Sequence, residues 1–172
     1  MVKTKAEELA EQQREVSISE FFVRNRHLLG FDNPTRALLM TVKELVDNAI
    51  DAAEEMRVLP EIFVDVKELS ENRYLVTVED NGPGIVKAQI PNVFGKLLYG
   101  SKFDKLSQTR GKQGLGVSVS VLYSQLTTGK ATKVKSKISP KKPAHYYELK
   151  INTQKNEPEI INEKDIDWNK DH

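Results

Sequence analysis

The sequence predicts an α+β fold, a two-layer α/β sandwich with a mostly antiparallel sheet. Helix-type patterns fill residues 17–29 and 34–56 before any strand pattern begins. Two pairs of alternating segments follow, each joined by a short turn as in an antiparallel hairpin, and another helical stretch lies between the pairs. This order of helices, hairpin, helices and hairpin is typical of helices packed on one face of an antiparallel sheet.

The composition fits one domain with a real core. The chain has 172 residues, of which 38% are hydrophobic and 30% charged, and its net charge of +1 gives no overall field that would attract nucleic acid or membrane. The absence of cysteine excludes disulfides and thiolate metal sites. The N-terminus lacks the pattern of a secretory signal, and no run approaches the roughly 20 apolar residues of a membrane span. We therefore expect a soluble cytoplasmic protein.

Side chains that can cap helices precede two helical stretches. The first helix is expected to end near Leu29, before Gly30, and the second to begin with Pro34 in its first turn and to end near Arg57. Residues 1–20 are expected to form an N-terminal arm, either frayed or reaching a second copy of the chain. The candidate caps are Ser17 or Ser19 for the first helix and Asp32 or Asn33 for the second.

The strands are predicted from alternation of apolar and polar residues. Residues 62–69 are expected to form a half-buried strand that pairs with residues 74–79, and residues 132–138 to pair with residues 145–151. Residues 116–125 are expected to form a helix. The remaining expected elements are one or two helices at 88–98, broken by Pro91, and a short strand at 160–161.

A polar stripe interrupts the apolar second helix. Glu44, Asn48 and Asp51 share one helical face, with Asp47 beside them. Buried carboxylates are costly without partners. A carboxylate there can take a proton from a water, and an amide oxygen one turn on suits Mg²⁺. The alternative is a helix whose acidic residues meet basic neighbours.

A strand that ends in Asp80-Asn81-Gly82-Pro83-Gly84 forms the second motif. Two glycines let the backbone turn sharply and approach a flat ligand. The carboxylate of Asp80 can accept a hydrogen bond from an exocyclic amine such as that of adenine. The alternative is a simple turn, because this sequence is strong turn chemistry on its own.

Closely spaced glycines precede the expected helix at 116–125 and form the third motif. Gly111, Gly114 and Gly116 would expose backbone N–H groups at the positive end of that helix, an arrangement that cradles phosphates. The spacing differs from those of the Rossmann fingerprint and the P-loop. The alternative is a flexible loop before a helix.

Together, in this order, the three motifs resemble the ATP-binding boxes of the GHKL superfamily, which includes gyrase-type topoisomerases, ninety-kilodalton heat-shock chaperones, histidine kinases and MutL proteins. Segments at 20–22, 94–103, 121–125 and 156–158 narrow this resemblance to the B subunits of the type IIB DNA topoisomerases, the topoisomerase VI family. It extends from about Ile18 to the end. The rival interpretations are another GHKL ATPase, MutL-like or chaperone-like, and a noncatalytic binding module.

The resemblance implies a Bergerat-type ATP-binding fold over residues 21–172 and assigns roles to particular residues. Glu44 would be the catalytic residue that activates water, Asn48 would bind Mg²⁺, and Asp80 would bind the adenine amino group. The other residues that it assigns to ATP binding are Gly84, Ser101, Lys102, Gly111, Lys112, Gln113, Gly114, Leu115, Gly116, Val117 and Ser118.

The resemblance also implies partners and a longer subunit. A second B subunit would join on ATP binding, an A subunit would complete a heterotetramer with two copies of each, and double-stranded DNA would be clamped, in a nucleoid-associated enzyme. We expect the chain to be truncated before the last elements of its domain, without the helical insert and transducer domain, and hence weakly active. A lysine cluster either touches DNA or is a solvated hairpin face: Lys130, Lys133, Lys135, Lys137, Lys141 and Lys142.

Overall fold

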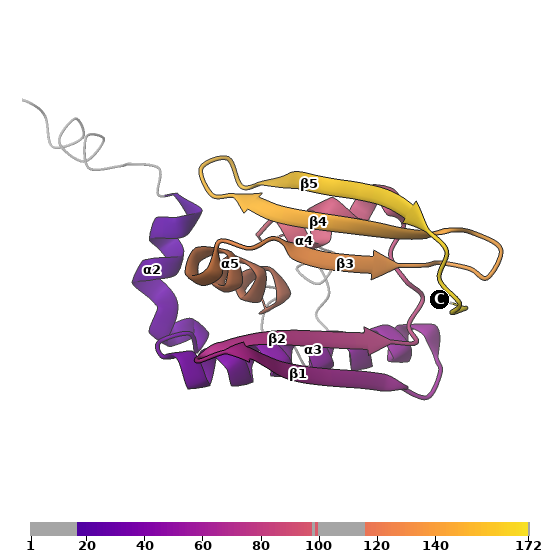
Figure 1. Ribbon diagram of the computed structural model, residues 1–172, viewed down its shortest axis with the longest axis horizontal. Helices are drawn as coiled ribbons and strands as arrows, with labels where there is room; N and C mark the ends of the chain where they lie inside the picture. The colour runs from indigo at the N-terminus through magenta and orange to yellow at the C-terminus, as the bar shows by residue number, and fades with distance from the viewer. Residues whose placement is uncertain (1–16, 98, 100–115, 172) are drawn as a thin grey trace, which may run out of the picture.

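The computed structural model describes residues 17–97, 99 and 116–171 (Figure 1). Expectations for residues 1–16, 98 and 100–115 lie outside the described residues, and residues 18–20 of the expected arm belong to the first helix. The elements in order are α2 (Ile18–Leu29), α3 (Pro34–Met56), β1 (Ile62–Ser70), β2 (Arg73–Asp80), the 3-10 helix η1 (Lys87–Gln89), α4 (Ile90–Gly95), α5 (Gly116–Thr128), β3 (Thr132–Ser136), β4 (Ala144–Asn152) and β5 (Glu157–Ile166).

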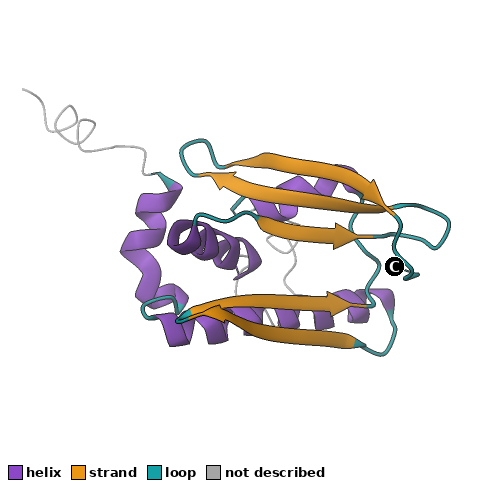
Figure 2. Ribbon diagram, in the orientation of Figure 1, coloured by secondary structure: helices purple, strands orange, loops and turns teal. Residues whose placement is uncertain are grey.

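The strands form two antiparallel sheets, one of β1 and β2 and one in the order β3-β4-β5. Figure 2 shows α3 behind the β1–β2 hairpin and α4 behind the three-stranded sheet, so the predicted α+β class with antiparallel strands is confirmed. The prediction did not anticipate two sheets. Within the described residues β2 and β3 are not paired, and η1, α4 and α5 lie between them in the chain.

Both long helices begin and end where local chemistry predicts. The Ser17 hydroxyl accepts a hydrogen bond from the Glu20 N–H, and the Asn33 amide oxygen accepts one from the Arg36 N–H at 2.9 Å. Pro34 opens α3. The left-handed residues that end the two helices are Gly30 and Arg57.

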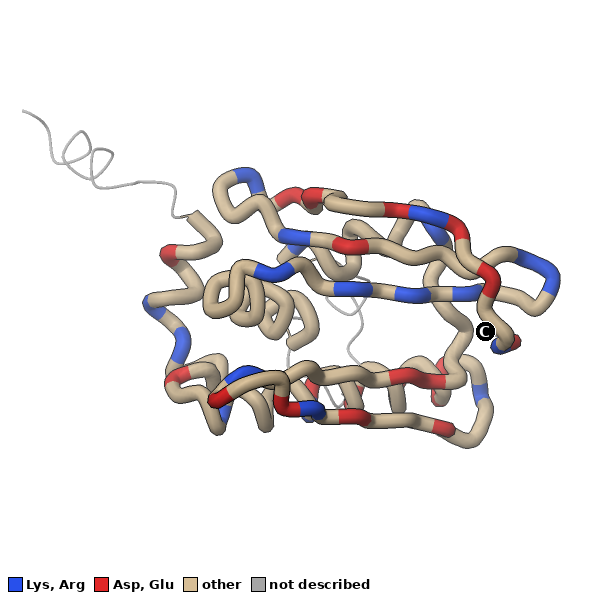
Figure 3. The backbone as a smooth tube through the Cα atoms, in the orientation of Figure 1, with Lys and Arg blue, Asp and Glu red and all other residues tan. Residues whose placement is uncertain are grey.

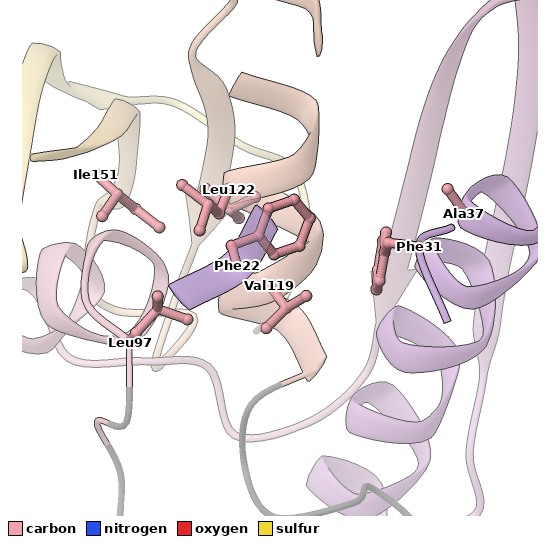
Figure 4. Close-up of a cluster of buried hydrophobic side chains, with 8 residues drawn as sticks. Phe22, Phe31, Ala37, Leu97, Val119, Leu122 and Ile151 are labelled. Atoms are coloured by element: carbon pink, nitrogen blue, oxygen red, sulfur yellow. The ribbon is translucent and has the colours of Figure 1, made fainter. Parts of the chain in front are cut away.

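The main core joins α2, α5 and β4 (Figure 4). Phe22 from α2 packs with Phe31, which precedes α3, and both rings contact Tyr123 of α5. Leu122 of α5 and Ile151 of β4 are almost fully buried in the same cluster. This packing fixes α5 against the sheet and sets the position of its N-terminus.

Two strands differ from the predictions. β1 is mostly exposed rather than half-buried, with Val64 41% and Val66 44% exposed, because α3 packs mainly against β2. β5 covers ten residues rather than a short stretch at 160–161, since it pairs with β4 from Ala144 opposite Ile166 to Asn152 opposite Glu157. Its acidic sequence is compatible with an edge strand, where one backbone edge and most side chains meet solvent. The one or two short helices expected at 88–98 are η1 and α4, and Pro91 lies in the first turn of α4, next to the boundary between them.

Four polar side chains each bond both the N–H and the C=O of distant backbone, as a neighbouring strand would. They satisfy buried or turning backbone that has no sheet partner at that point. The pairs are Gln125 with Ile151, Asn156 with Leu97, Ser136 with Ile85, and Asn81 with Leu59 and Glu61. None of the described helices is long and apolar enough to cross a membrane.

Candidate active site

Helix α3 is the common wall on which the predicted motifs meet. The Glu44 side chain lies against Gly116 at the start of α5, and Ala52 lies against Gly82 in the loop after β2. Eight residues of helix separate these two contacts, which is about 12 Å along the axis. One helix therefore carries a polar stripe with α5 at one end and the Asp80 loop at the other.

The Glu44 carboxylate is buried and incompletely bonded. The residue is 4% exposed, and its Oε2 has no hydrogen-bond partner among the described residues. The Lys43 ammonium lies 3.6 Å from its Oε1. A buried polar oxygen without a donor is unfavourable, so this atom is suited to accept a hydrogen bond from a water or a ligand.

Asn48 lies one turn further along the same face. Its Nδ2 donates to the Glu44 carbonyl at 2.6 Å, which directs the amide oxygen away from that carbonyl. Asp51, the third member of the stripe, is 7% exposed. The spacing of the stripe thus places Glu44 and Asn48 side by side, as the sequence predicts.

Asp47 lies at the margin of the stripe and pairs with Lys43 at 2.7 Å. The hydrogen bond to Asp47 raises the pKa of Lys43, and the charge of Glu44 adds to the effect. Lys43 therefore stays charged beside the carboxylate of Glu44. This lysine was not among the predicted site residues, and the signal that could have found it is its adjacency to Glu44.

The Asp80 carboxylate is oriented by its own loop. Its Oδ1 accepts a hydrogen bond from the Gly82 N–H at 2.9 Å. A methyl group on Gly82 would lie 2.7 Å from both Ala52 Cβ and Asp80 Oδ1, so this glycine lets the loop rest on α3. Gly82 was not among the predicted site residues, although the Asp-x-Gly spacing was the available signal.

Gly84 packs closely against the protein backbone. Its φ of 68° is left-handed, and a Cβ there would lie 2.1 Å from the Lys137 carbonyl oxygen, next to the end of β3. The loop therefore needs glycine at this position to pack against β3. Its assignment to ATP binding stays a prediction.

Only the last part of the predicted phosphate loop is described. Gly116, Val117 and Ser118 form the first residues of α5, where Ser118 is buried and Val117 packs on the main core. A helix N-terminus carries backbone N–H groups that have no partner within the helix, together with the positive end of the helix dipole. The predicted residues outside the described part of the chain are Ser101, Lys102, Gly111, Lys112, Gln113, Gly114 and Leu115.

A family model described as "Histidine kinase-, DNA gyrase B-, and HSP90-like ATPase" matches residues 33–153. The match spans α3, both glycine motifs and all of β4. The chain belongs to this ATPase family. The predicted GHKL membership is confirmed, and Glu44, Asn48 and Asp80 all fall inside the matched region.

Curated relatives of this ATPase-family chain are named as the B subunit of type 2 DNA topoisomerase 6. The proteins from Methanococcoides burtonii and Methanosarcina mazei are each 56% identical over 97% of this chain and 27% of their own length. The protein from Natronomonas pharaonis is 56% identical over 97% of this chain and 21% of its own length. The predicted similarity to the B subunits of type IIB topoisomerases is confirmed, and the chain spans about a quarter of the length of these relatives.

Basic residues follow β3 and the turn between β3 and β4 (Figure 3). Lys133 and Lys135 are exposed on β3, and Lys141 and Lys142 are exposed in the turn after it. Lys137 instead donates from its ammonium to the carbonyl oxygens of Trp168 and Lys170, so it holds the segment after β5 and is not part of a solvated face.

Proposed function

We propose that the chain is the ATP-binding and ATP-hydrolysing domain of the B subunit of a type IIB topoisomerase. The observation that carries this proposal is the meeting of three motifs on α3. Glu44 is buried beside Asn48, and its Oε2 has no partner among the described residues. Gly116 lies against Glu44, and Gly82, which bonds Asp80, lies against Ala52. Family membership and the similarity to proteins named for topoisomerase 6 support the same function.

Each side chain has a role that its surroundings fit. Glu44 Oε2 would accept the proton of a water that attacks the terminal phosphate, because it is buried and lacks a donor among the described residues. Asp80 would accept a hydrogen bond from the adenine amino group, while its Oδ1 also accepts the hydrogen bond from the Gly82 N–H. The N-terminus of α5 would face the phosphates with its N–H groups. Positioning and charge stabilisation of this kind supply most of the catalysis in phosphoryl transfer.

The donor set fits Mg²⁺ held mainly by the nucleotide. The described residues contain no cluster of three or more histidine, cysteine, aspartate or glutamate side chains that could hold a metal alone. Mg²⁺ commonly keeps several waters and binds one or two protein oxygens plus substrate phosphates. The Asn48 amide oxygen would be the protein ligand. The ion, when bound, would neutralise phosphate charge.

The proposed partners follow from the relatives' name. A protein named as the B subunit of a topoisomerase works with another subunit. The proposed partners are therefore an A subunit that cleaves DNA and a second copy of this chain. Binding of ATP would bring two copies together around double-stranded DNA, and hydrolysis would release them. Such an enzyme acts where the chromosome is, in the nucleoid, relaxing supercoils and decatenating duplexes.

Nucleotide binding tests the proposal directly. A non-hydrolysable ATP analogue with Mg²⁺ should raise the melting temperature by mass action, and the matching GTP analogue should raise it much less. Guanine presents a carbonyl where adenine presents the amino group that Asp80 would bind. The substitution Asp80→Asn should weaken ATP-analogue binding at least tenfold, because a neutral amide is a weaker acceptor than a carboxylate.

The matched control is Asp65→Asn on exposed β1, which should leave the shift unchanged. A shift that is equal for both nucleotides, or unaffected by Asp80→Asn, contradicts the assigned base contact. The absence of any shift at millimolar nucleotide contradicts the proposed function.

A further inference from the structure

We propose that Gly116 is a positioning residue for Glu44, because glycine at this position leaves the space that the Glu44 carboxylate fills. The inference rests on the proposed function, in which Glu44 activates water. In this role Gly116 acts by positioning the Glu44 carboxylate, which is separate from any contact that it makes with phosphate.

The fit between the two residues is close. A Cβ built on Gly116 would lie 1.7 Å from Glu44 Oε2, 2.4 Å from its Cδ and 2.7 Å from its Cγ. Non-bonded atoms do not approach so closely. A side chain at position 116 therefore cannot coexist with the Glu44 carboxylate in its present position. The clash falls on the whole end of the Glu44 side chain.

The backbone of Gly116 gives no other reason for glycine. The described glycines with positive φ are Gly30, Gly84 and Gly129, so Gly116 has a conformation that other residues adopt readily. Glycine within a helix costs about 0.5–1 kcal/mol relative to alanine. Room for Glu44 is the feature that explains a glycine at the first residue of α5.

The helix cannot move aside to make the space. Val119 and Leu122, one and two turns into α5, are buried in the main core at 3% and 0% exposure. The Glu44 side chain is the flexible member of the pair. A methyl group at 116 would therefore displace the carboxylate from its site and leave the fold in place.

A double-mutant cycle on thermal stability tests the contact without any nucleotide. Gly116→Ala should lower the melting temperature of the wild-type chain. The loss should be smaller with Glu44→Asp, whose carboxylate is one methylene shorter. With Glu44→Ala, which removes the clashing atoms, the loss should disappear or become a small gain, because alanine is the better helix former. An equal loss in all three backgrounds would overturn the proposal.

Hydrolysis of bound ATP supplies the functional readout. In a single-turnover assay, Gly116→Ala should slow phosphate release at least tenfold relative to the wild-type chain. The matched control is Gly129→Ala at the other end of the same helix, where a Cβ meets nothing within 4 Å. Its left-handed φ of 68° costs stability, but it should leave hydrolysis unchanged. A hydrolysis rate unchanged by Gly116→Ala would overturn the proposal.

The two hypotheses fail differently. Lack of nucleotide binding by the wild-type chain would contradict the proposed function, whatever the cycle shows. Normal nucleotide binding with no coupling between Gly116 and Glu44 would contradict only the positioning role.

Discussion

At the scale of single residues, the polar stripe on α3 separates two kinds of acid. Asp47 is paired with Lys43 at 2.7 Å at the margin, and Lys43 is half exposed, so solvent screens this pair and its contribution to stability is small. Glu44 is buried and keeps Oε2 without a partner in the described residues. An unpaired buried oxygen lowers stability, which is a cost often found where a group is kept for chemistry.

The change Glu44→Gln separates chemistry from binding. Glutamine keeps the shape of the side chain but cannot take a proton from water, so ATP hydrolysis should fall by about 10²–10⁴-fold. The affinity for an ATP analogue, measured from the melting-temperature shift, should stay within a few-fold of the wild-type value.

The control for Glu44→Gln is Asp47→Asn, which removes an acid on the same helix but outside the buried contact. Hydrolysis by this variant should stay within a few-fold of wild type. Similar losses in the two variants would show that charge on α3, and not a specific base, supports turnover.

At the scale of elements, the sequence predicts best what local chemistry decides. The ends of α2 and α3 depend on Ser17, Gly30, Asn33 and Pro34, all within a few residues of the helices that they delimit. The length of β5 depends instead on pairing with β4, and the exposure of β1 depends on where α3 lies. These long-range properties leave no local pattern, which explains why both were mispredicted.

The attachment of α5 to β4 is a second property without a local signal. The Gln125 side chain donates to the Ile151 carbonyl at 2.9 Å and accepts from its N–H at 2.7 Å. The pairing of β3 with β4 stops at Leu149, which lies opposite Thr132, the first residue of β3. At Ile151 the Gln125 side chain therefore takes the place of a residue of the neighbouring strand. It fixes α5, and hence Gly116, relative to the sheet.

The substitution Gln125→Leu should lower the free energy of unfolding by about 1–3 kcal/mol, because both backbone groups of buried Ile151 lose their partner. Chemical denaturation measures this change. The control Gln154→Leu, in the exposed turn between β4 and β5, should change stability by less than about 0.5 kcal/mol. Equal effects of the two substitutions would mean that the Gln125 bonds contribute no net stability.

At the scale of the whole molecule, the site depends on the placement of two sheets that are not paired with each other within the described residues. The loop after β2 reaches the second sheet through Ser136, which bonds both backbone groups of Ile85. The segment after β5 returns to the first sheet, where Lys170 pairs with Glu79 at 2.8 Å. Spacing alone predicted the shared face of Glu44 and Asn48, whereas the meeting of α3 with the other two motifs followed only from the family resemblance.

Lys137 anchors this returning segment, and the single tryptophan of the chain reports on it. The Lys137 ammonium donates to the Trp168 carbonyl at 3.0 Å and to the Lys170 carbonyl at 2.6 Å. Lys137→Met keeps the apolar stem but removes these donors, so the segment should detach and Trp168 should become more accessible to a soluble fluorescence quencher. The change should be local, with a small effect on the melting temperature, because the segment lies outside both core clusters.

The control for this anchor is Lys135→Met, which removes an exposed ammonium two residues earlier on β3. Its quenching should equal that of the wild-type chain, because the Lys135 ammonium is exposed and the two carbonyl contacts belong to Lys137. If Lys137→Met also leaves quenching unchanged, the two carbonyl contacts do not hold the segment. The link from β5 back to β2 would then rest on the exposed pair of Lys170 and Glu79, which added salt should weaken.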